Sequence, residues 1–363
     1  MSSSDLDIVG RRFVTTASVA AAIIAGVLLA ATALADPTGL LVASGWPRGL
    51  CAAGLKVRDD RAWKPYMAAI HLPEQAILGS SRVSRGFDSR AFGPAGGKAL
   101  NLGMSSATMS DIDALARKTI EEAPVRRIWI GLDFGAVADA GATVADFGQP
   151  DLAGTPRLRS LRTGLLSPGA LEATLTLVRH PSSCATPQFD AQAFVNPEAD
   201  DTGNRHVVIP DERARARQLA SWRRTASKRR RSYAANIAEL ERLLVHLAEH
   251  DVTVILYRSP SHPAFDTLLA EAGLTPLQQR WRSDTDQMAS RHGVILVAAD
   301  APDFLLGVDA SGCTGLRADC VFHDATHFRP EVGAAIVRAG EAALTLRAQG
   351  QSLSSTADPS IVR

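Results

Sequence analysis

The chain has 363 residues, of which 46% are hydrophobic and 21% are charged, and this length and composition allow a sizeable buried core in one large domain or two smaller ones. A chain that is disordered throughout is therefore excluded. The 39 Lys and Arg residues nearly balance the 38 Asp and Glu residues, so the formal charge is +1 at pH 7. This balance argues against nucleic acid or another polyanion as the general partner.

Residues 13–35 form an uncharged, apolar segment directly after Arg11 and Arg12. A helix rises about 1.5 Å per residue, so this segment is long enough to cross a hydrocarbon core of about 30 Å and is predicted to be a transmembrane anchor in a lipid bilayer. The two arginines place residues 1–12 in the cytoplasm and the main domain outside, in the periplasm of a bacterium. The Ala-Leu-Ala sequence that ends at Ala35 also suits a signal-cleavage site, so secretion after cleavage is the alternative.

Residues 36–73 are punctuated by Gly and Pro and are predicted to be a stalk and linker that ends in a short helix around residues 63–70. Short apolar runs then alternate with helical patterns over residues 74–346. The five runs are Gln75–Leu78, Ala99–Leu102, Arg127–Leu132, Thr253–Tyr257 and Val294–Val297. Such runs are typical of strands buried on both faces, so the sequence predicts a three-layer α/β/α sandwich around a roughly five-stranded, mostly parallel sheet.

Amphipathic periods predict helices in this α/β region over Asp111–Glu122, with Ser110 as its cap, and over Tyr233–His250, Pro276–His292 and Pro330–Leu346. Residues from about 140 to 235 lack a lasting apolar period and are predicted to be an insertion. The insertion ends in the basic run Arg213–Arg231, which either contacts anionic lipid or an acidic polysaccharide or forms a solvated helix face. Residues 347–363 are predicted to be a disordered tail.

The four cysteines, Cys51, Cys184, Cys313 and Cys320, are an even number, as is common in an oxidising compartment. Cys313 and Cys320 are close enough in sequence to staple the loop between them, with buried free thiols as the alternative. None of the four has the spacing of zinc ligands, and no metal site is predicted.

Three residues at the ends of predicted elements have the chemistry of a catalytic triad. Ser81 follows the first strand, and open α/β sheets place their sites at the carboxyl ends of strands. Asp324 stands three residues before His327, just ahead of the last helix. A serine needs a base to take its proton, and the base needs a carboxylate to fix its tautomer, so the three residues predict a nucleophile, a base and an orienting acid.

A serine nucleophile also needs donors that stabilise the oxyanion formed during acyl transfer. The loop from Gly103 to Ser106 follows the second predicted strand, so its backbone amides are expected to face the Ser81 hydroxyl. The amide of Ser81 and the side chain of Asn101 are the other expected donors. Arg82 is a candidate for binding a carboxylate or phosphate of a substrate, and His262, which follows the fourth strand, is a candidate for substrate contact.

Four segments resemble the sequence blocks of the SGNH/GDSL hydrolase superfamily, and within it a group of membrane-anchored bacterial SGNH-like proteins. The segments are residues 76–88, 99–112, 127–137 and 323–333, and with the anchor they span most of the chain outside the predicted insertion. The resemblance assigns the nucleophile to Ser81 and the Asp-x-x-His pair to Asp324 and His327. The oxyanion glycine of the second block falls on Ser106.

Two positions depart from the family's pattern. Asp133 stands where the third block usually carries an asparagine that donates to the oxyanion, and an ionised carboxylate cannot donate. Asp133 therefore points elsewhere, or binds Arg82, or the chemistry is not ordinary ester hydrolysis. Ser80 replaces the usual aspartate before the nucleophile, as in relatives that act on cell-envelope polymers, such as the D-alanyl transfer protein of teichoic acids.

The resemblance implies a serine esterase or O-acyltransferase that acts on a cell-surface polysaccharide or acylated envelope polymer through an acyl-enzyme on Ser81. It implies no metal and no organic cofactor, and it leaves room for a polytopic membrane partner that supplies acyl donors. Asp133 keeps a second hypothesis open, a non-catalytic binding or assembly protein of an envelope polysaccharide system. A lipid or phospholipid esterase is a third.

Overall fold

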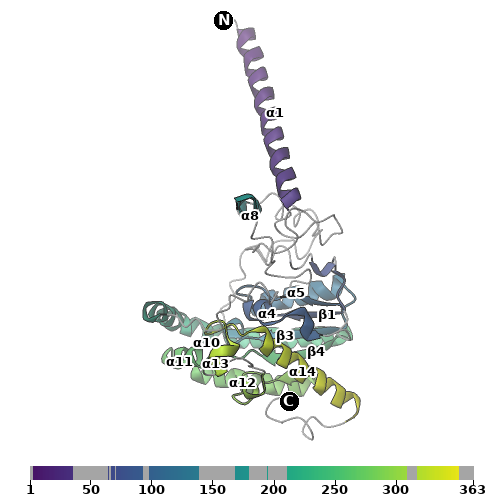
Figure 1. Cartoon of the computed structure of the whole chain (residues 1–363), viewed down its shortest axis with the longest axis vertical. Helices are drawn as coiled ribbons and strands as arrows, with labels where there is room; N and C mark the ends of the chain where they lie inside the picture. The colour runs from purple at the N-terminus through teal and green to yellow at the C-terminus, as the bar shows by residue number, and fades with distance from the viewer. Residues whose placement is uncertain are drawn as a thin grey trace.

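The computed structural model describes residues 3–35, 64, 67–69, 71–92, 98–138, 168–179, 194, 211–308 and 317–350. Most of the predicted stalk, most of the predicted insertion and the tail beyond residue 350 lie outside these ranges. The described chain is mixed α/β and mostly helical, and one apolar helix at its N-terminus precedes a parallel sheet (Figure 1).

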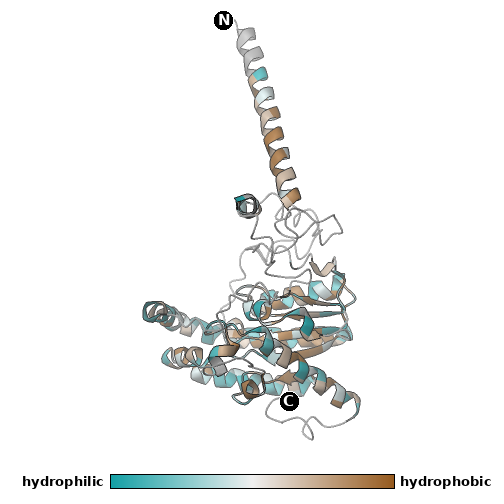
Figure 2. Cartoon of the chain, viewed as in Figure 1, coloured by the Kyte–Doolittle hydropathy of each residue, from teal (hydrophilic) through white to brown (hydrophobic). Residues whose placement is uncertain are grey.

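Helix α1 (Ser3–Ala35) contains the predicted anchor and ends at the predicted residue. Its part from Arg11 to Ala35 is long and apolar enough to cross a membrane, and it is the single helix of this kind among the described residues. Hydrophobic side chains predominate toward its C-terminal end (Figure 2). A single-pass anchor agrees with these features, and a cleaved signal sequence would share them.

The five predicted strands all form, and they make one sheet in the order β2-β1-β3-β4-β5. Every neighbouring pair is parallel. The carboxyl ends of all five strands therefore lie at one edge of the sheet, where the polar residues that follow each strand can meet. The strands are β1 (Gln75–Leu78), β2 (Ala99–Asn101), β3 (Arg127–Leu132), β4 (Thr253–Arg258) and β5 (Ile295–Val297).

Alternate residues of the strands enter two separate hydrophobic clusters, because successive side chains of a strand point to opposite faces. Ile128 and Ile130 belong to one cluster, and Trp129 between them belongs to the other. The first cluster also contains side chains of α5 (Met109–Glu122), α10 (Glu212–Glu249) and α12 (Thr275–His292), and the second contains those of α14 (Pro330–Ala348).

Two predicted helix starts were wrong. Helix α5 is capped by Thr108 instead of Ser110, because the Thr108 side chain and Asp111 form a reciprocal capping box. Helix α10 begins at Glu212, far ahead of the predicted start near Tyr233. Its first half is dense in Arg and Ala, which favour helix but give little apolar period, so periodicity missed it.

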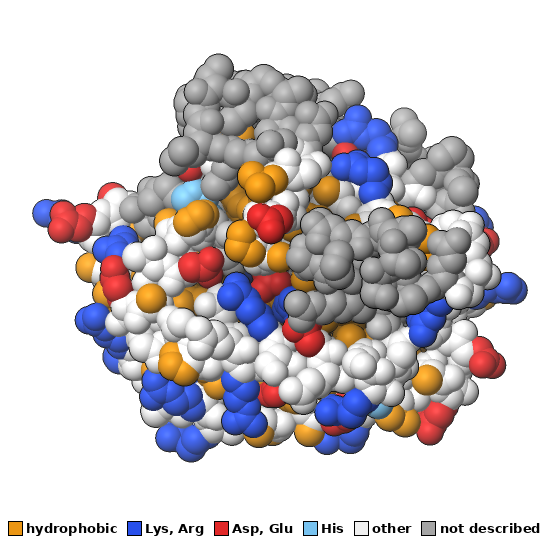
Figure 3. All heavy atoms as spheres, turned by 90° about the horizontal axis from the view of Figure 1, so that it is seen from below, with side chains coloured by type: hydrophobic (Ala, Val, Ile, Leu, Met, Phe, Trp, Pro, Cys, Tyr) orange, Lys and Arg blue, Asp and Glu red, His pale blue; other side chains and the backbone are white. Residues whose placement is uncertain are grey.

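Part of the basic run in α10 packs on the protein itself. Arg215 forms an ion pair with Glu271, and Arg223 and Arg230 donate to the backbone carbonyls of Glu271 and Gly273. On the face turned away from α1, Lys and Arg side chains are interspersed with Asp and Glu (Figure 3). The contacts of Arg215, Arg223 and Arg230 favour an ordinary charged helix face for this part of the run.

Several short elements were not predicted. Two of them follow strands and carry residues of the site: α4 (Ser81–Gly86) and α11 (Pro263–Glu271). The last helix continues to Ala348, so the first residues of the predicted disordered tail are helical, and residues 351–363 lie outside the described residues. The other short elements are η1 (Ser89–Phe92), α6 (Phe134–Ala138), α8 (Pro168–Arg179), η4 (Phe304–Gly307) and α13 (Arg317–Val321).

Candidate active site

Ser81 is held at the carboxyl end of β1 by a sharp transition from strand to helix. Gly79 allows this turn, because a Cβ atom there would lie 2.4 Å from Cγ2 of Val83. Ser80 then caps α4, its Oγ accepting a hydrogen bond from the backbone N–H of Arg82. Ser81 is thus the first residue of α4 and stands half-buried at the edge of the sheet.

Asp324 and His327 lie on a tight loop between α13 and α14. The loop is closed by two backbone hydrogen bonds, from His323 N to His327 O at 2.8 Å and from Arg329 N to Val321 O at 2.8 Å. Phe322 and Phe328 pair across it, and both side chains are fully buried. The loop backbone is therefore fixed by bonds and packing on both sides of the two candidate catalytic residues.

The structure brings the three predicted triad residues into one hydrogen-bonded chain. His327 Nε2 lies 2.8 Å from Ser81 Oγ, and His327 Nδ1 lies 2.7 Å from Asp324 Oδ2. An ionised carboxylate can only accept, so Nδ1 carries the proton and Nε2 is left to accept the proton of the serine hydroxyl. This is the tautomer that a general base for Ser81 needs.

Asp324 is held in the ionised form by its surroundings. Burial raises the pKa of Asp324, but the hydrogen bond from His327 and those from the backbone N–H groups of Thr326 and His327 outweigh it and hold that pKa well below its usual range. Oδ1 accepts from Thr326 N at 2.8 Å, from Thr326 Oγ1 at 2.9 Å and from His327 N at 3.0 Å. The carboxylate is therefore fixed in orientation as well as in charge.

Asn101 and Gly103, which the sequence predicts as oxyanion donors, form hydrogen bonds within the protein. The Asn101 side chain donates from Nδ2 to Val83 O at 3.1 Å, and its Oδ1 accepts from Gly103 N at 2.9 Å. The next amide, that of Met104, donates to Gly79 O at 2.9 Å. These bonds tie the loop after β2 to the turn before Ser81, because fully buried polar groups must pair with each other when water is absent.

Ser106 adopts a backbone conformation that glycine adopts most easily, with φ at +53°. Its side chain is exposed at the end of the same loop, beside the exposed Ser105. The predicted correspondence of Ser106 with a glycine therefore has a backbone counterpart here.

Lys64 is a residue of this site that sequence reasoning missed. Its side chain is only 2% exposed, and Nζ donates to the backbone carbonyls of Asn101 and Gly103. A lysine on the predicted stalk thus reaches the loop after β2 from outside the α/β region. No motif marks such a residue, because its role depends on a contact between segments far apart in sequence.

Asp133 directly follows β3 and contacts both residues that flank Ser81. It accepts a hydrogen bond from Ser80 Oγ, and its Oδ1 lies 3.4 Å from Arg82 Nε. Its side chain is buried, so the ion pair with Arg82 offsets the cost of burying the charge. Of the predicted alternatives for Asp133, the structure shows the contact with Arg82.

Arg82 and His262, the two candidates for substrate contact, are both buried and already paired. Arg82 is 6% exposed and donates from Nη1 to Pro260 O at 3.1 Å and to Ser261 Oγ at 2.9 Å. His262 is 8% exposed, and its Nδ1 accepts from the backbone N–H of Ala264 as the cap of α11. Both side chains thus have structural bonds, and their contact with a substrate stays a prediction.

The Nε2 atom of His262 lies 2.9 Å from Asp319 Oδ1, so a second His–Asp pair stands beside the triad. Because Nδ1 of His262 accepts, Nε2 carries the proton and donates to Asp319. Asp319 precedes Cys320, which is disulfide-bonded. The other three cysteines lie outside the described residues, so the predicted pairing of Cys320 with Cys313 stays a prediction.

Within the described ranges, no group of three or more His, Cys, Asp or Glu side chains is arranged to hold a metal ion. The residues brought together at the sheet edge instead have the arrangement of a serine nucleophile, a histidine base and an orienting carboxylate. No family model matches the chain, and no curated protein resembles it significantly in sequence.

Proposed function

We propose that the protein is an SGNH-like serine esterase or O-acyltransferase that acts on a cell-surface polysaccharide. The observation that carries the proposal is the unbroken hydrogen-bonded chain from Ser81 through His327 to Asp324 at the carboxyl edge of the parallel sheet. In acyl transfer, this arrangement provides a nucleophile, a base that becomes an acid, and a carboxylate that orients the base.

Each step follows from the positions of these atoms. Ser81 Oγ attacks the carbonyl carbon of an acyl ester while His327 Nε2 takes the hydroxyl proton. Asp324 stabilises the resulting imidazolium through its short bond to Nδ1. The tetrahedral intermediate then expels the alcohol, which receives the proton from His327, and leaves the acyl group as an ester on Ser81. Water or a glycan hydroxyl, deprotonated by His327, completes hydrolysis or transfer.

The oxyanion would be held by backbone amides rather than by a side chain. The N–H of Ser81 is among the first of α4, which the helix does not use in its own hydrogen bonds. The exposed turn at Ser105 and Ser106 is the proposed source of a second backbone donor. Asp133 is turned toward Ser80 and Arg82, which moderates its repulsion of a developing negative charge.

The SGNH assignment implies the three-layer α/β/α sandwich, and the two hydrophobic clusters of the sheet support it. The two departures from the family's pattern also contact each other, since Ser80 donates to Asp133. The family's aspartate before the nucleophile and its asparagine after the third strand are thus replaced as a pair, by a serine and an aspartate that hydrogen bond.

The proposed substrate class depends on where the domain lies. Arg11 and Arg12 precede the apolar segment, so the positive-inside rule places the α/β domain outside the cytoplasmic membrane, where envelope polysaccharides are found. A polytopic membrane partner would then supply the acyl donor from the cytoplasmic side.

Labelling with a fluorophosphonate, which reacts with activated serines, tests the proposal on the full-length chain in detergent. We expect wild type to be labelled, Ser81→Ala and His327→Ala to lose labelling, and Ser283→Ala, which alters an exposed serine on α12, to retain it. Thermal unfolding of each variant shows whether lost labelling reflects lost folding. Absence of labelling in folded wild type would contradict an activated Ser81.

One observation favours a second candidate function, a non-catalytic glycan-binding or assembly protein. The buried carboxylate of Asp133 replaces an oxyanion donor, and the Asn101 side chain is committed to structural bonds. This function predicts glycan binding that persists in Ser81→Ala, together with no labelling of the folded wild-type protein.

A further inference from the structure

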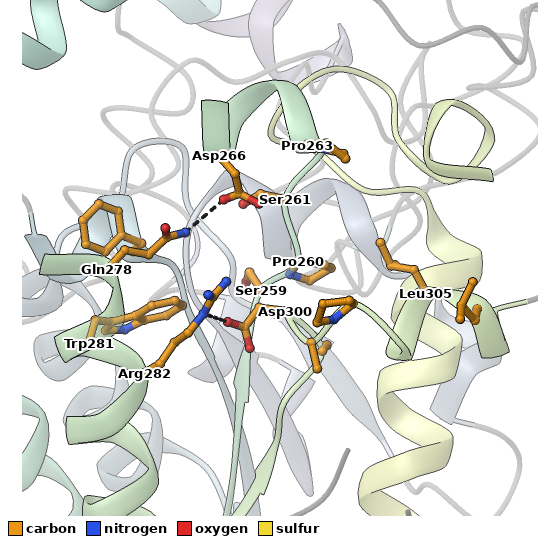
Figure 4. Close-up of a pocket in the computed structure, with 15 residues that line it drawn as sticks. Ser259, Pro260, Ser261, Pro263, Asp266, Gln278, Trp281, Arg282, Asp300 and Leu305 are labelled. Carbon is orange, nitrogen blue, oxygen red and sulfur yellow. Dashed lines mark hydrogen bonds and ion pairs between the residues drawn. The ribbon is translucent and has the colours of Figure 1, made fainter. Parts of the chain in front are cut away.

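A pocket of about 440 Å³ lies at the carboxyl edge of the sheet, on the side of β4 and β5 (Figure 4). Its wall begins with Phe134 after β3 and continues with Ser259–Ser261 after β4 and Asp300–Pro302 after β5. Helix α12 and the η4 turn close the other sides. This volume is within the range of about 300–1,000 Å³ that is typical of small-molecule sites.

The pocket and the triad share one wall, the loop between β4 and α11. Arg82, the residue after the nucleophile, donates to Pro260 O and Ser261 Oγ, and both of those residues line the pocket. The backbone N–H of His262 donates to Ala325 O, within the loop that carries the Asp–His pair. A ligand that occupies the pocket would therefore lie one loop away from Ser81 and the Asp324–His327 pair.

The pocket combines apolar lining residues with paired polar groups. Phe134 and Trp281 contact each other edge to face at 5.9 Å between ring centroids, and Pro302 and Leu306 lie among the other apolar lining residues. Polar groups occupy two edges. Gln278 Nε2 donates to Asp266 Oδ1 at 3.0 Å, and Arg282 Nε donates to Asp300 Oδ2 at 2.6 Å (Figure 4).

Ser259 gives the lining a buried hydroxyl. Its side chain is almost fully buried, and a hydrogen bond between Ser259 and the hydroxyl of Tyr257 partly offsets the burial that raises the pKa of Tyr257. The Ser259 hydroxyl adds a polar group to the lining that can exchange hydrogen bonds with a ligand.

Most charges of the lining are paired within the protein. Asp300 pairs with Arg282 and with Arg258, and Arg258 also pairs with Asp286. Asp266 adds a carboxylate, which would repel a phosphate or uronate. A saturated acyl chain would leave Gln278 and Asp266 in contact with hydrocarbon and would cost their desolvation.

We infer that this pocket is a subsite for an uncharged sugar ring of the polysaccharide acceptor. A pyranose ring has an apolar face of C–H groups and an edge of hydroxyls, which matches the apolar lining residues and the amide and carboxylate groups of the pocket. The inference rests on the proposed function for the identity of the polymer. Binding itself does not require Ser81.

Saturation-transfer NMR on the full-length protein tests the inference with four probes: cellotriose, tri-N-acetylchitotriose, trigalacturonate and hexanoate. We expect at least one neutral trisaccharide to bind wild type and Ser81→Ala equally, and trigalacturonate and hexanoate not to bind. Gln278→Ala removes an amide of the lining, and Leu306→Arg places a long charged side chain at an exposed lining position. Each of the two substitutions should weaken trisaccharide binding about tenfold or more. Gln278→Ala removes a hydrogen-bond partner of the sugar, to which polar sites are sensitive, and Leu306→Arg obstructs the lining.

Val245→Arg is the matched control for Leu306→Arg, because it introduces the same side chain at an exposed apolar residue of α10 outside the pocket. It should leave binding unchanged. Failure of both neutral trisaccharides to bind wild type, binding that neither pocket variant weakens, or preference for trigalacturonate or hexanoate would each overturn the inference. If the wild-type protein binds a neutral trisaccharide but is not labelled by the fluorophosphonate, the proposed catalysis is overturned and the inferred sugar subsite is still supported.

Discussion

Replacement of Asp324 by asparagine should abolish most of the reactivity of Ser81 while leaving the fold in place. The new side chain would keep an oxygen able to accept the three bonds that Oδ1 now accepts from Thr326 and His327. Its amide would then face Nδ1 of His327, where Oδ2 now accepts at 2.7 Å. An amide donor there favours the tautomer that is protonated on Nε2, which can no longer take the proton of Ser81.

The size of the effect follows from the loss of the correct tautomer and of the charge that stabilises the imidazolium. The same exchange in a serine protease triad lowers the rate about 10⁴-fold, and this factor corresponds to about 5.5 kcal/mol in the barrier. We expect a loss of the same order in the rate constant for fluorophosphonate labelling. Single-exponential labelling curves at several probe concentrations give that constant.

Asp319→Asn supplies a matched control, because Asp319 pairs with His262 at 2.9 Å beside the triad without contacting Ser81. It should label at nearly the wild-type rate. Labelling of Asp324→Asn within about tenfold of wild type, or an equal slowing in Asp319→Asn, would refute the assignment of Asp324 as the orienting carboxylate.

Three further results are expected. Lys64→Met removes the buried donor to two backbone carbonyls of the loop after β2. Urea unfolding should show that the free energy of unfolding falls by about 2 kcal/mol, and fluorophosphonate labelling should slow. No change in either quantity would contradict the idea that Lys64 holds this loop in position. Ser106 has a positive φ, which glycine adopts with less strain, so Ser106→Gly should raise the free energy of unfolding by up to about 1 kcal/mol. A decrease of that size would contradict the left-handed conformation of Ser106. The pKa of Asp324 is lower in the folded protein than in the unfolded chain. The ionised carboxylate therefore contributes fully to the free energy of unfolding above about pH 4, and this contribution is lost as the pH falls through the pKa of the folded protein. The urea midpoints of wild type and Asp324→Asn should therefore approach each other as the pH is lowered. A difference between the midpoints that does not change with pH would show that ionisation of Asp324 does not stabilise the fold.

Much of the fold could be predicted from local sequence, because buried parallel strands and amphipathic helices carry periodic signals. All five strands were placed within about one residue of their observed ends, which is closer than such boundaries usually allow. Helix α10 shows the limit of the method. Its basic first half has helix-forming composition but little apolar period, so its start at Glu212 could be recovered from propensity and from the Asp211 cap alone.

The sequence also predicts that Ser81, Asp324 and His327 act together, since each lies directly beside an element whose position the pattern predicts, and the structure joins them by hydrogen bonds. The bonds of the accessory residues could not be predicted. Asn101, Arg82 and His262 were assigned to substrate or oxyanion contacts, but each is committed to bonds within the protein. A polar residue beside a strand end carries the same sequence signal whether its side chain faces the cleft or a neighbouring loop.

The sequence by itself determined the apolar anchor segment, the alternation of strands and helices, and the chemistry of Ser81, Asp324 and His327, because these depend on residue type and short spacing. Only the tertiary structure decided that Asp133 pairs with Ser80 and Arg82, that Lys64 reaches the loop after β2, and that a pocket lies across one loop from the triad. These features join segments that are distant along the chain. Their free energies depend on burial and on the distances between side chains, which no local pattern records.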